Sequence, residues 1–462
     1  MKKFLYIFFP ALSFFLIAQQ AIFSEAIFVG WADENHPPLI ILEPLPKPIY
    51  FAGWADSEQP DDGEQTKRAF SFSRRMFELG IDAGAGFDNN LFSFNDIFTE
   101  IIEIDMNKIT DDIRSDGLIM NIPVGAGLSF NIMNIKIGRG LWDIGFFSGV
   151  AGNININLPR SLFYIFAEGN FSHDILAGNI NTSGAVYSNA GLNLSAAFGR
   201  LRLGITPAVF SPLVFIPRSG INFLLRTEDY ITLSAGADIN VYSPFFSEGD
   251  FVDIQTALSE LSLGFDLSIH GEYRLFPFLD IGGSISSIPL SSAAMRNRTR
   301  YTLLLVGEGD NGEEIFFDEF VFNVLDLADG SFQVPSFDFR ETFDLHEVMV
   351  MRPFRFDVYA RYRVFGESEL LTIRPNIGFT VDMNNRQGYF NTGVGIRLSL
   401  QELLVFDLAT NFEEAVWKHS LGFTLNLRLL EFAVEAALRS ERFTGGFKRQ
   451  GFGLNAGVRI GW

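Results

Sequence analysis

The segment Gly451–Trp462, GFGLNAGVRIGW, alternates without interruption between apolar residues and small or polar ones. This period of two is that of a β-strand, in which successive side chains point to opposite faces. The strand stops on an aromatic residue, with no polar tail to shield it. We therefore expect its edge to be paired, as in a sheet that closes on itself. The apolar row consists of Phe452, Leu454, Ala456, Val458, Ile460 and Trp462.

The same alternation fills the C-terminal third of the sequence. It is clearest in residues 354–365, 371–383 and 389–400, which are separated only by the short polar segments GESE and NNRQ. Strands joined by such turns form the hairpins of an antiparallel meander. Earlier runs repeat the pattern, beginning with FELGIDAGAGF at residues 77–87, which we expect to pair with the last strand.

Strand length distinguishes two sheet architectures. The alternating runs reach roughly 10 to 14 residues, whereas about 5 to 6 is usual in globular proteins and about 9 to 11 tilted residues cross a hydrocarbon layer. The sequence therefore predicts an all-β fold, a transmembrane antiparallel β-barrel of about 14 strands, with 12 or 16 also allowed. A secreted β-sandwich is the alternative, but it explains neither the strand length nor the many Gly and Ser residues on the polar face.

The N-terminus has the pattern of an export signal. Lys2 and Lys3 precede an apolar run at residues 4–18, too short for the roughly 20 residues that span a bilayer as a helix. Small residues, Ser24 and Ala26, occupy the −3 and −1 positions of a cleavage site. Cleavage after Ala21 and a retained membrane anchor are the alternatives. The predicted division is a signal peptide at 1–26, an N-terminal extension or plug at 27–70, and the barrel at 71–462.

Composition excludes several classes of protein. The 462 residues contain no cysteine, so there is neither a lipoprotein attachment site nor a disulfide framework. The formal net charge of −20 argues against a nucleic-acid partner, whose phosphates require a basic surface. Beyond the signal peptide no apolar run of 18 residues occurs, so membrane-spanning helices are not expected.

Three segments interrupt the alternation. Residues 95–117 and 158–170 have helical patterns and predict short loop helices that cap the barrel or line its interior. Residues 308–350 are acidic and aromatic, which indicates a long loop or an inserted hairpin.

The sequence offers little chemistry for an enzyme. Of the five histidines, His270 alone shares a predicted lumen face with carboxylates, those of Asp266 and Glu272, while His419 falls on the lipid-facing register and His346 in a loop. Residues two apart on a strand lie about 7 Å apart, too far for a direct catalytic hydrogen bond. Phosphate-binding and zinc-protease motifs are missing, and the acidic loops favour solvated charges over a calcium site. We predict no catalytic residue, no metal and no cofactor.

A set of arginines falls on the polar phase of the C-terminal strands, together with Asp357, Asp382, Glu431 and Glu435. One interpretation is a lattice of ion pairs along the inner wall. The other is a ligand path that attracts an anionic head group by charge-assisted hydrogen bonds. The two are compatible. The arginines are Arg355, Arg361, Arg363, Arg374, Arg397 and Arg459.

Residues 158–170, 188–210 and 278–309 resemble a bacterial outer-membrane barrel family of unassigned function, in which a P..L....GN helix and an lGxIxW-like strand recur. The resemblance covers residues 70–460, and the tryptophan of that strand is missing. In size, strand count and interstrand helices the chain is also similar to the long-chain fatty-acid transporter class of 14-stranded barrels. That similarity implies an N-terminal hatch and passage of hydrophobic molecules through the lumen and sideways into the membrane. No ligand-binding residue can be carried over.

Together these features predict passive transport of hydrophobic or amphipathic, fatty-acid-like small molecules across the bacterial outer membrane. The expected partners are outer-membrane lipid, a hydrophobic small molecule and the barrel-assembly machinery, since the last strand, with its terminal aromatic residue, resembles the signal that this machinery reads. A structural or surface-exposed barrel with a sealed lumen and a general porin remain as alternatives.

Overall fold

The computed structural model describes residues 76–89, 117–138, 140–167, 175–227, 231–247, 250–252, 254–308, 314–317, 319–322, 336–366, 368–385, 387–401, 403–413, 416–427, 429–440, 443 and 451–462. The predicted signal peptide, the extension at 27–70 and the helical segment at 95–116 lie outside this part of the chain.

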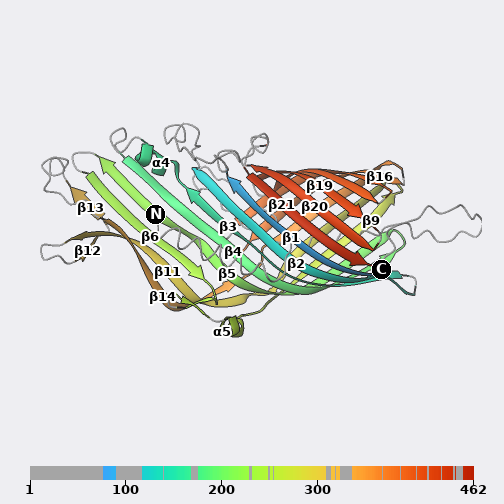
Figure 1. Cartoon of the computed structure of the whole chain (residues 1–462), viewed down its shortest axis with the longest axis horizontal. Coiled ribbons are helices and arrows are strands. Elements are labelled where there is room, and N and C mark those ends of the chain that lie inside the picture. The colour runs from blue at the N-terminus through green and yellow to red at the C-terminus, as the bar shows by residue number, and fades with distance from the viewer. Residues whose placement is uncertain are drawn as a thin grey trace, which may run out of the picture.

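Fourteen strands of the described chain form a closed antiparallel ring (Figure 1). Each pairs with the next, and the last pairs with the first, so the predicted barrel is confirmed. A closed ring satisfies backbone hydrogen bonds without a free edge, which is the condition for crossing a bilayer with strands. The ring order is β1 (Phe77–Asn89), β2 (Leu118–Ile137), β3 (Gly140–Leu158), β4 (Ile175–Phe198), β5 (Leu201–Thr227), β9 (Gly264–Phe276), β10 (Leu279–Ser291), β15 (Phe354–Phe365), β16 (Ser368–Asp382), β17 (Gln387–Leu400), β18 (Leu404–Glu413), β19 (Val416–Asn426), β20 (Leu430–Ser440) and β21 (Gly451–Gly461).

The seam between β1 and β21 closes the ring. Its register runs from Glu78 opposite Gly461 to Asp88 opposite Gly451. Beyond the last paired residue, the Trp462 carbonyl accepts hydrogen bonds from the amides of Met76 and Phe77, at 2.7 and 3.0 Å. The rings of Trp462 and Phe77 stack with centroids 5.7 Å apart. The terminal residue is therefore fixed by both its backbone and its ring.

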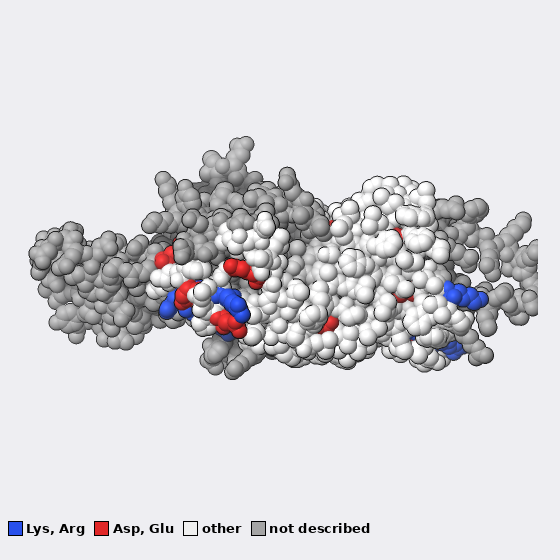
Figure 2. Space-filling view, turned by 90° about the horizontal axis from the view of Figure 1, so that it is seen from below, with Lys and Arg blue, Asp and Glu red and all other residues white. Residues whose placement is uncertain are grey.

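Apolar side chains cover the outside of the ring, and polar ones line the inside. Figure 2 shows one side of the molecule, where charged side chains gather toward the ends and the surface between them is largely uncharged. This distribution is the inverse of a soluble protein and excludes the sandwich. An even-stranded barrel with an apolar belt is the architecture of bacterial outer-membrane proteins, so the predicted location is confirmed. Exposed apolar residues include Leu79, Ile81, Phe146, Leu203, Ile281, Phe356, Ile377, Leu408, Leu421, Val434 and Leu454.

The termini of the described barrel lie at the same end as the turns that join β2 to β3, β4 to β5 and β15 to β16, and we call this the turn end. Gly366, which follows β15, has a φ of 69°. A tight hairpin needs such a left-handed residue, and glycine adopts it at little steric cost. No helix in the described ranges is long and apolar enough to cross a membrane.

The strands of the N-terminal half are longer than the sequence predicts. β4 has 24 residues and β5 has 27. The first part of β5 pairs with β9, from Leu201 opposite Tyr273 to Phe210 opposite Gly264, whereas its second part pairs with β6 (Ile231–Tyr242). The wall therefore continues above β9, away from the turn end.

An upper sheet extends this tall side of the wall (left in Figure 1). It consists of β6, β11 (Ala293–Glu308) and β14 (Ser336–Val350), with the short strands β12 (Glu314–Phe317) and β13 (Glu319–Phe322). The segment 308–350 thus contains strands that join the wall. This agrees with an inserted hairpin and corrects the reading of a single long loop, and His346 lies in β14 rather than in a loop.

Three neighbouring wall strands are interrupted at the same level, which we call the crease. β10 passes into β11 at Ser292, and β14 passes into β15 at residues 351–353. Beside them, β6 is followed by residues 243–263, and the wall then continues as β9. These residues contain β7 (Phe246–Ser247), β8 (Asp250–Phe251) and α5 (Ile254–Ser259). The crease separates the transmembrane wall from the upper sheet.

Helix α4 (Arg160–Ala167) follows β3 and lies within the predicted helical segment 158–170. Pro159 precedes it, and the fixed φ of proline suits the start of a helix. The side chain of Phe163 is buried. Short loop helices therefore accompany the barrel, as the sequence predicts.

Candidate ligand path in the lumen

The inner face of β15 brings its polar residues toward the lumen. Arg363 is only 2% exposed, whereas Phe356, on the opposite phase, is 44% exposed. The strand alternation therefore places arginine side chains inside the barrel and aromatic rings outside it.

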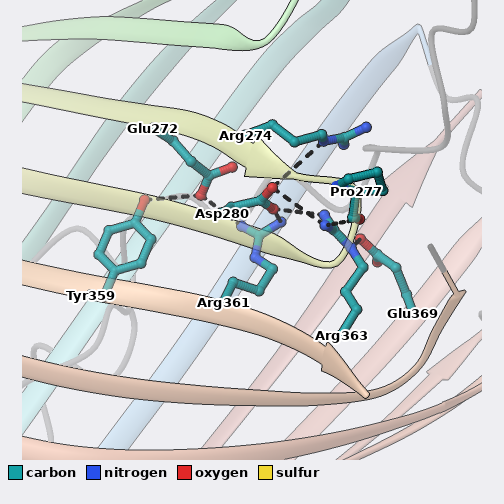
Figure 3. A network of polar contacts seen from close by, with 8 residues as sticks. All are labelled: Glu272, Arg274, Pro277, Asp280, Tyr359, Arg361, Arg363 and Glu369. Carbon is teal, nitrogen blue, oxygen red and sulfur yellow. Dashed lines mark hydrogen bonds and ion pairs between the residues drawn. The ribbon is translucent and has the colours of Figure 1, made fainter. Parts of the chain in front are cut away.

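A network of ion pairs surrounds Asp280 near the turn end (Figure 3). Arg363 Nη2 donates to Asp280 Oδ2 at 2.6 Å, and the Arg361 and Arg274 guanidinium nitrogens lie 3.6 and 3.5 Å from the same carboxylate. One buried carboxylate of β10 thus meets guanidinium groups from both neighbouring strands, β9 and β15.

Glu272 forms the second centre of this network. Its Oε2 accepts from Arg361 Nη2 at 2.9 Å and from the Tyr359 hydroxyl at 3.1 Å (Figure 3). Arg202 stands directly opposite Glu272 in the β5–β9 register and donates to Asp143 of β3 at 2.7 Å. The network therefore continues across the wall from β15 to β3.

Further ion pairs stand near the turn end of other strands. Arg397 Nε donates to Asp407 Oδ1 at 2.7 Å between β17 and β18. Arg459 Nη1 donates to Glu431 Oε1 at 2.6 Å between β21 and β20. Together with the networks around Asp280 and Glu272, they form what we call the charge collar, in which arginines pair with carboxylates of neighbouring strands.

The predicted arginines lie at different distances from the turn end. Four of them belong to the charge collar: Arg361, Arg363, Arg397 and Arg459. Arg374 of β16 faces the lumen and stands opposite Gly395 of β17. Arg355 lies near the crease, where its Nη2 is 3.0 Å from Asp357 Oδ1 and 3.7 Å from Glu413 Oε1.

The predicted carboxylates have different partners. Asp357 and Glu431 pair with arginines, as described above, and Glu435 lies 2.7 Å from Lys418 Nζ. Asp382 instead accepts from the Asn384 amide at 3.0 Å and from Asn385 Nδ2 at 2.6 Å. It therefore stabilises the turn that follows β16.

Three histidines, His270, His346 and His419, lie within the described part of the chain. His270 faces the lumen, with its ring across Gly204, where an added Cβ would overlap it. His419 lies on the outward register, covered by Phe443, whose carbonyl is 2.7 Å from the His419 Nε2. Within the described residues, no three His, Cys, Asp or Glu side chains are placed to hold a metal ion.

Two buried ion pairs were missed from the sequence. Arg439 Nη1 donates to Asp88 Oδ2 at 3.0 Å near the seam, and Arg352 Nη1 donates to Asp266 Oδ2 at 3.0 Å at the crease. The alternation of β20 places Arg439 on the polar face, so its position could have been found. Arg352 lies in the break between β14 and β15, where the alternation lapses.

An apolar cluster faces the lumen at the crease. Tyr187 is buried there, and its hydroxyl donates to the Met351 carbonyl at 3.4 Å. The Phe210 ring meets the Tyr187 ring edge-on, with centroids 6.1 Å apart. The inner wall is therefore not uniformly polar. The cluster, named here the crease cluster, consists of Ala185, Tyr187, Phe210, Phe215, Tyr242, Ala293, Met295 and Val350.

Above the crease, Arg298 and Asp344 form a charged pair between β11 and β14. Arg298 Nε donates to Asp344 Oδ1 at 2.7 Å, and hydrogen bonding to Arg298 lowers the pKa of Asp344. The Tyr242 hydroxyl lies 3.3 Å from His346 Nδ1 beside this pair. Polar groups therefore also line the upper sheet.

No family model and no curated protein matches the sequence. Among solved structures, the chain is similar to the toluene transporter TodX of Pseudomonas putida, with 9% identity, a TM-score of 0.42 and coverage of 84% of this chain and 89% of that one. It is likewise similar to the toluene transporter TbuX of Ralstonia pickettii, with 9% identity, a TM-score of 0.41 and coverage of 84% and 90%. For a FadL homologue of Pseudomonas aeruginosa the identity is 7%, the TM-score 0.39 and the coverage 85% and 91%.

Proposed function

We propose that this barrel allows hydrophobic or amphipathic small molecules to cross the outer membrane passively, without catalysis. The observation that supports the proposal is the crease cluster, a set of buried apolar side chains on the inner side of the wall. The lumen of a water-filled porin is polar throughout. An inner wall that offers aromatic and aliphatic contacts suits cargo that prefers them to water.

The two levels of the lumen wall suit the two parts of an amphipathic molecule. The crease cluster meets its apolar part, and the charge collar, nearer the turn end, meets its polar head. The arginines of the proposed ligand path are paired with protein carboxylates, for example Arg363 with Asp280 and Arg397 with Asp407. An anionic head group must therefore compete with these partners. The resulting contacts are weak and exchange easily, as passage through a pore requires.

We further propose that residues 1–26 direct export and that residues 27–70 act as a plug in the lumen. The barrel-assembly machinery is the proposed partner of β21, whose outward row ends in Trp462. In these roles the segments act in export of the chain and in its insertion into outer-membrane lipid.

Uptake into liposomes tests the function. The purified barrel in liposomes should transfer a fluorescently labelled long-chain fatty acid to the interior, while the liposomes should not swell in small sugars. Swelling in sugars would identify a general porin. A barrel that passes neither the fatty acid nor the sugars would instead be the sealed, structural alternative.

Replacing arginines tests the ligand path. Arg361→Ala combined with Arg374→Ala should weaken binding of the labelled fatty acid and slow its uptake. Arg296→Ala is the matched control, because Arg296 is an exposed arginine of the upper sheet that pairs with Glu347. Unchanged binding in the double variant would remove these arginines from the path.

A further inference from the structure

A row of amides lies on the inner face of β2, β3 and β4. Asn121 of β2 stands opposite Asn155 of β3, which in turn stands opposite Ser183 of β4. Asn153 and Asn157 flank Asn155 on the same face of β3. We call these five residues the amide row. Each is between 0 and 2% exposed.

The amide row has hydrogen-bonding atoms without protein partners. Asn153 and Asn157 leave both the nitrogen and the oxygen of their side-chain amides unpaired, and Asn121 and Asn155 leave the oxygen unpaired. The hydroxyl of Ser183 is also without a partner. Buried polar groups in native proteins are almost always satisfied by protein, water or ligand. This row therefore needs a partner that the described side chains do not supply.

The neighbouring charges are already matched with each other. Asn121 Nδ2 donates to Asp88 Oδ2 at 3.2 Å, and the same oxygen accepts from Arg439 Nη1 at 3.0 Å. The row itself carries no charge. A partner with a net charge would find no opposite charge within the row and would lose its own hydration.

The unpaired atoms include both donors and acceptors. Turning an amide by 180° exchanges its donor and its acceptor, and a hydroxyl group suits either orientation because it both donates and accepts. Three amides at alternate positions of β3 extend over roughly 13 Å, at about 3.3 Å per residue. The row thus offers repeated contacts to a molecule that carries several hydroxyl groups.

We propose that the amide row binds a neutral, hydroxyl-rich group such as a sugar or polyol. This proposal rests on the proposed function and deepens it, because it names the chemical class of the head group on an amphipathic cargo. The amide row selects a polyhydroxyl head, and the crease cluster, which includes Ala185 and Tyr187 of β4, meets the apolar chain.

The test uses the full mature chain in lipid nanodiscs with n-octyl β-D-glucoside below its micellar concentration as the probe. Titration calorimetry should detect binding of the glucoside to the unmodified barrel. Asn153→Leu combined with Asn157→Leu should weaken it about tenfold or more, since several hydrogen bonds are lost. Sodium octanoate, which has the same chain length but an anionic head, should bind equally to both.

The control is Asn391→Leu. Asn391 is a buried amide on β17, but its Nδ2 donates to Thr380 Oγ1 at 2.9 Å. Glucoside binding should survive this change. Ser183→Ala provides a milder variant of the row, so that failure of the double variant to fold does not end the test. Equal glucoside affinity in all folded variants, or no glucoside binding to the unmodified barrel, would overturn the proposal and leave ordered water as the partner of the row.

Liposome uptake separates this proposal from the function on which it rests. If the barrel takes up labelled fatty acid but does not bind the glucoside, the amide row is wrong and transport stands. If the glucoside binds but neither the fatty acid nor a labelled alkyl glucoside enters the liposome, the transport proposal fails and the site stands.

Discussion

At the scale of single residues, Asp280 is the carboxylate with the most arginine partners in the charge collar. Asp280 and Arg363 are both 2% exposed at their side chains. Removing one partner of a buried ion pair leaves the other charge without compensation, which costs far more than the pair contributes as a whole. The balance of the network therefore depends on this one carboxylate.

Asp280→Asn should lower the free energy of unfolding by about 3 to 5 kcal/mol, because Arg363 and Arg361 lose their shared counter-charge. Urea unfolding in detergent, followed by tryptophan fluorescence, measures the change. Glu347→Gln is the control, since its pair with Arg296 is exposed and should contribute less than about 1 kcal/mol. Equal losses in the two variants would contradict this account of the collar.

Asp344 should titrate below the ordinary value of about 3.9 for an aspartate, because Arg298 favours its charged form. Its contribution to stability is therefore present above that ordinary pKa and is lost as the pH falls through the lowered one. The ¹³C chemical shift of the carboxyl carbon reports the titration. In Arg298→Gln the midpoint should rise toward the ordinary value, and an unshifted midpoint would contradict the pairing.

At the scale of elements, the sequence predicts regular strands well and interrupted ones poorly. β15, β16, β17 and β21 have one uninterrupted alternation, so their faces follow directly from the sequence. β5 contains Pro207, Pro212 and Pro217, which argue against a strand. Pro212 lies at a register shift with β4 and Pro217 within one with β6, where a missing donor is tolerated. The length of β5 therefore could not be predicted from the strand propensities of its residues.

The candidate site, too, could be predicted from the sequence only in part. The inward arginines could be predicted because each lies on the polar phase of a regular strand. Their partners could not, because Asp280 and Glu272 meet Arg361 only through the β9–β10–β15 neighbourhood, and the alternation gives no information on which strands are neighbours across a long insertion. Nor could it predict the crease cluster, which assembles from segments on both sides of the breaks.

The turn after β16 should hold the crease in place. Asn384 Oδ1 accepts from the Met351 amide at 2.9 Å, and its Nδ2 donates to the Met351 carbonyl at 2.6 Å. Asn384→Ala should therefore speed amide hydrogen exchange at residues 347–353, measured by mass spectrometry, without affecting β21. Ser368→Ala, in the turn at the other end of β16, should leave this exchange unchanged. Identical exchange in both variants would show that the break is fixed by other contacts.

The C-terminal residue should matter for closure. Deleting Trp462 removes its hydrogen bonds to Met76 and Phe77 and the ring stack on Phe77. Refolding into lipid vesicles should become slower, as judged by the appearance of the fast-migrating band on unheated gels. Trp462→Phe keeps the backbone and a ring and should refold at nearly the normal rate. If the deletion refolds as fast as the intact chain, the terminal contacts play no part in closure.

At the scale of the whole molecule, the ring of paired strands should withstand detergent and yield only to heat. The purified barrel should therefore migrate faster on a detergent gel before boiling than after it. It should also require detergent or lipid to remain in solution, because its exposed belt is apolar. A purified barrel that is soluble without either would contradict the membrane-spanning architecture.

The seam gives the barrel an order of assembly. Its strands β1 and β21 pair directly, and Asp88 of β1 also accepts a hydrogen bond from Arg439 of β20, 351 residues away in the sequence. Contacts between such distant positions form slowly, because almost the entire chain must be looped before they are possible. A chain that lacks β20 and β21 would hold two open edges, and Asp88 would be without Arg439. Closure thus requires the whole series of strands, since a truncated copy would leave the edges of β1 and of its last strand unpaired.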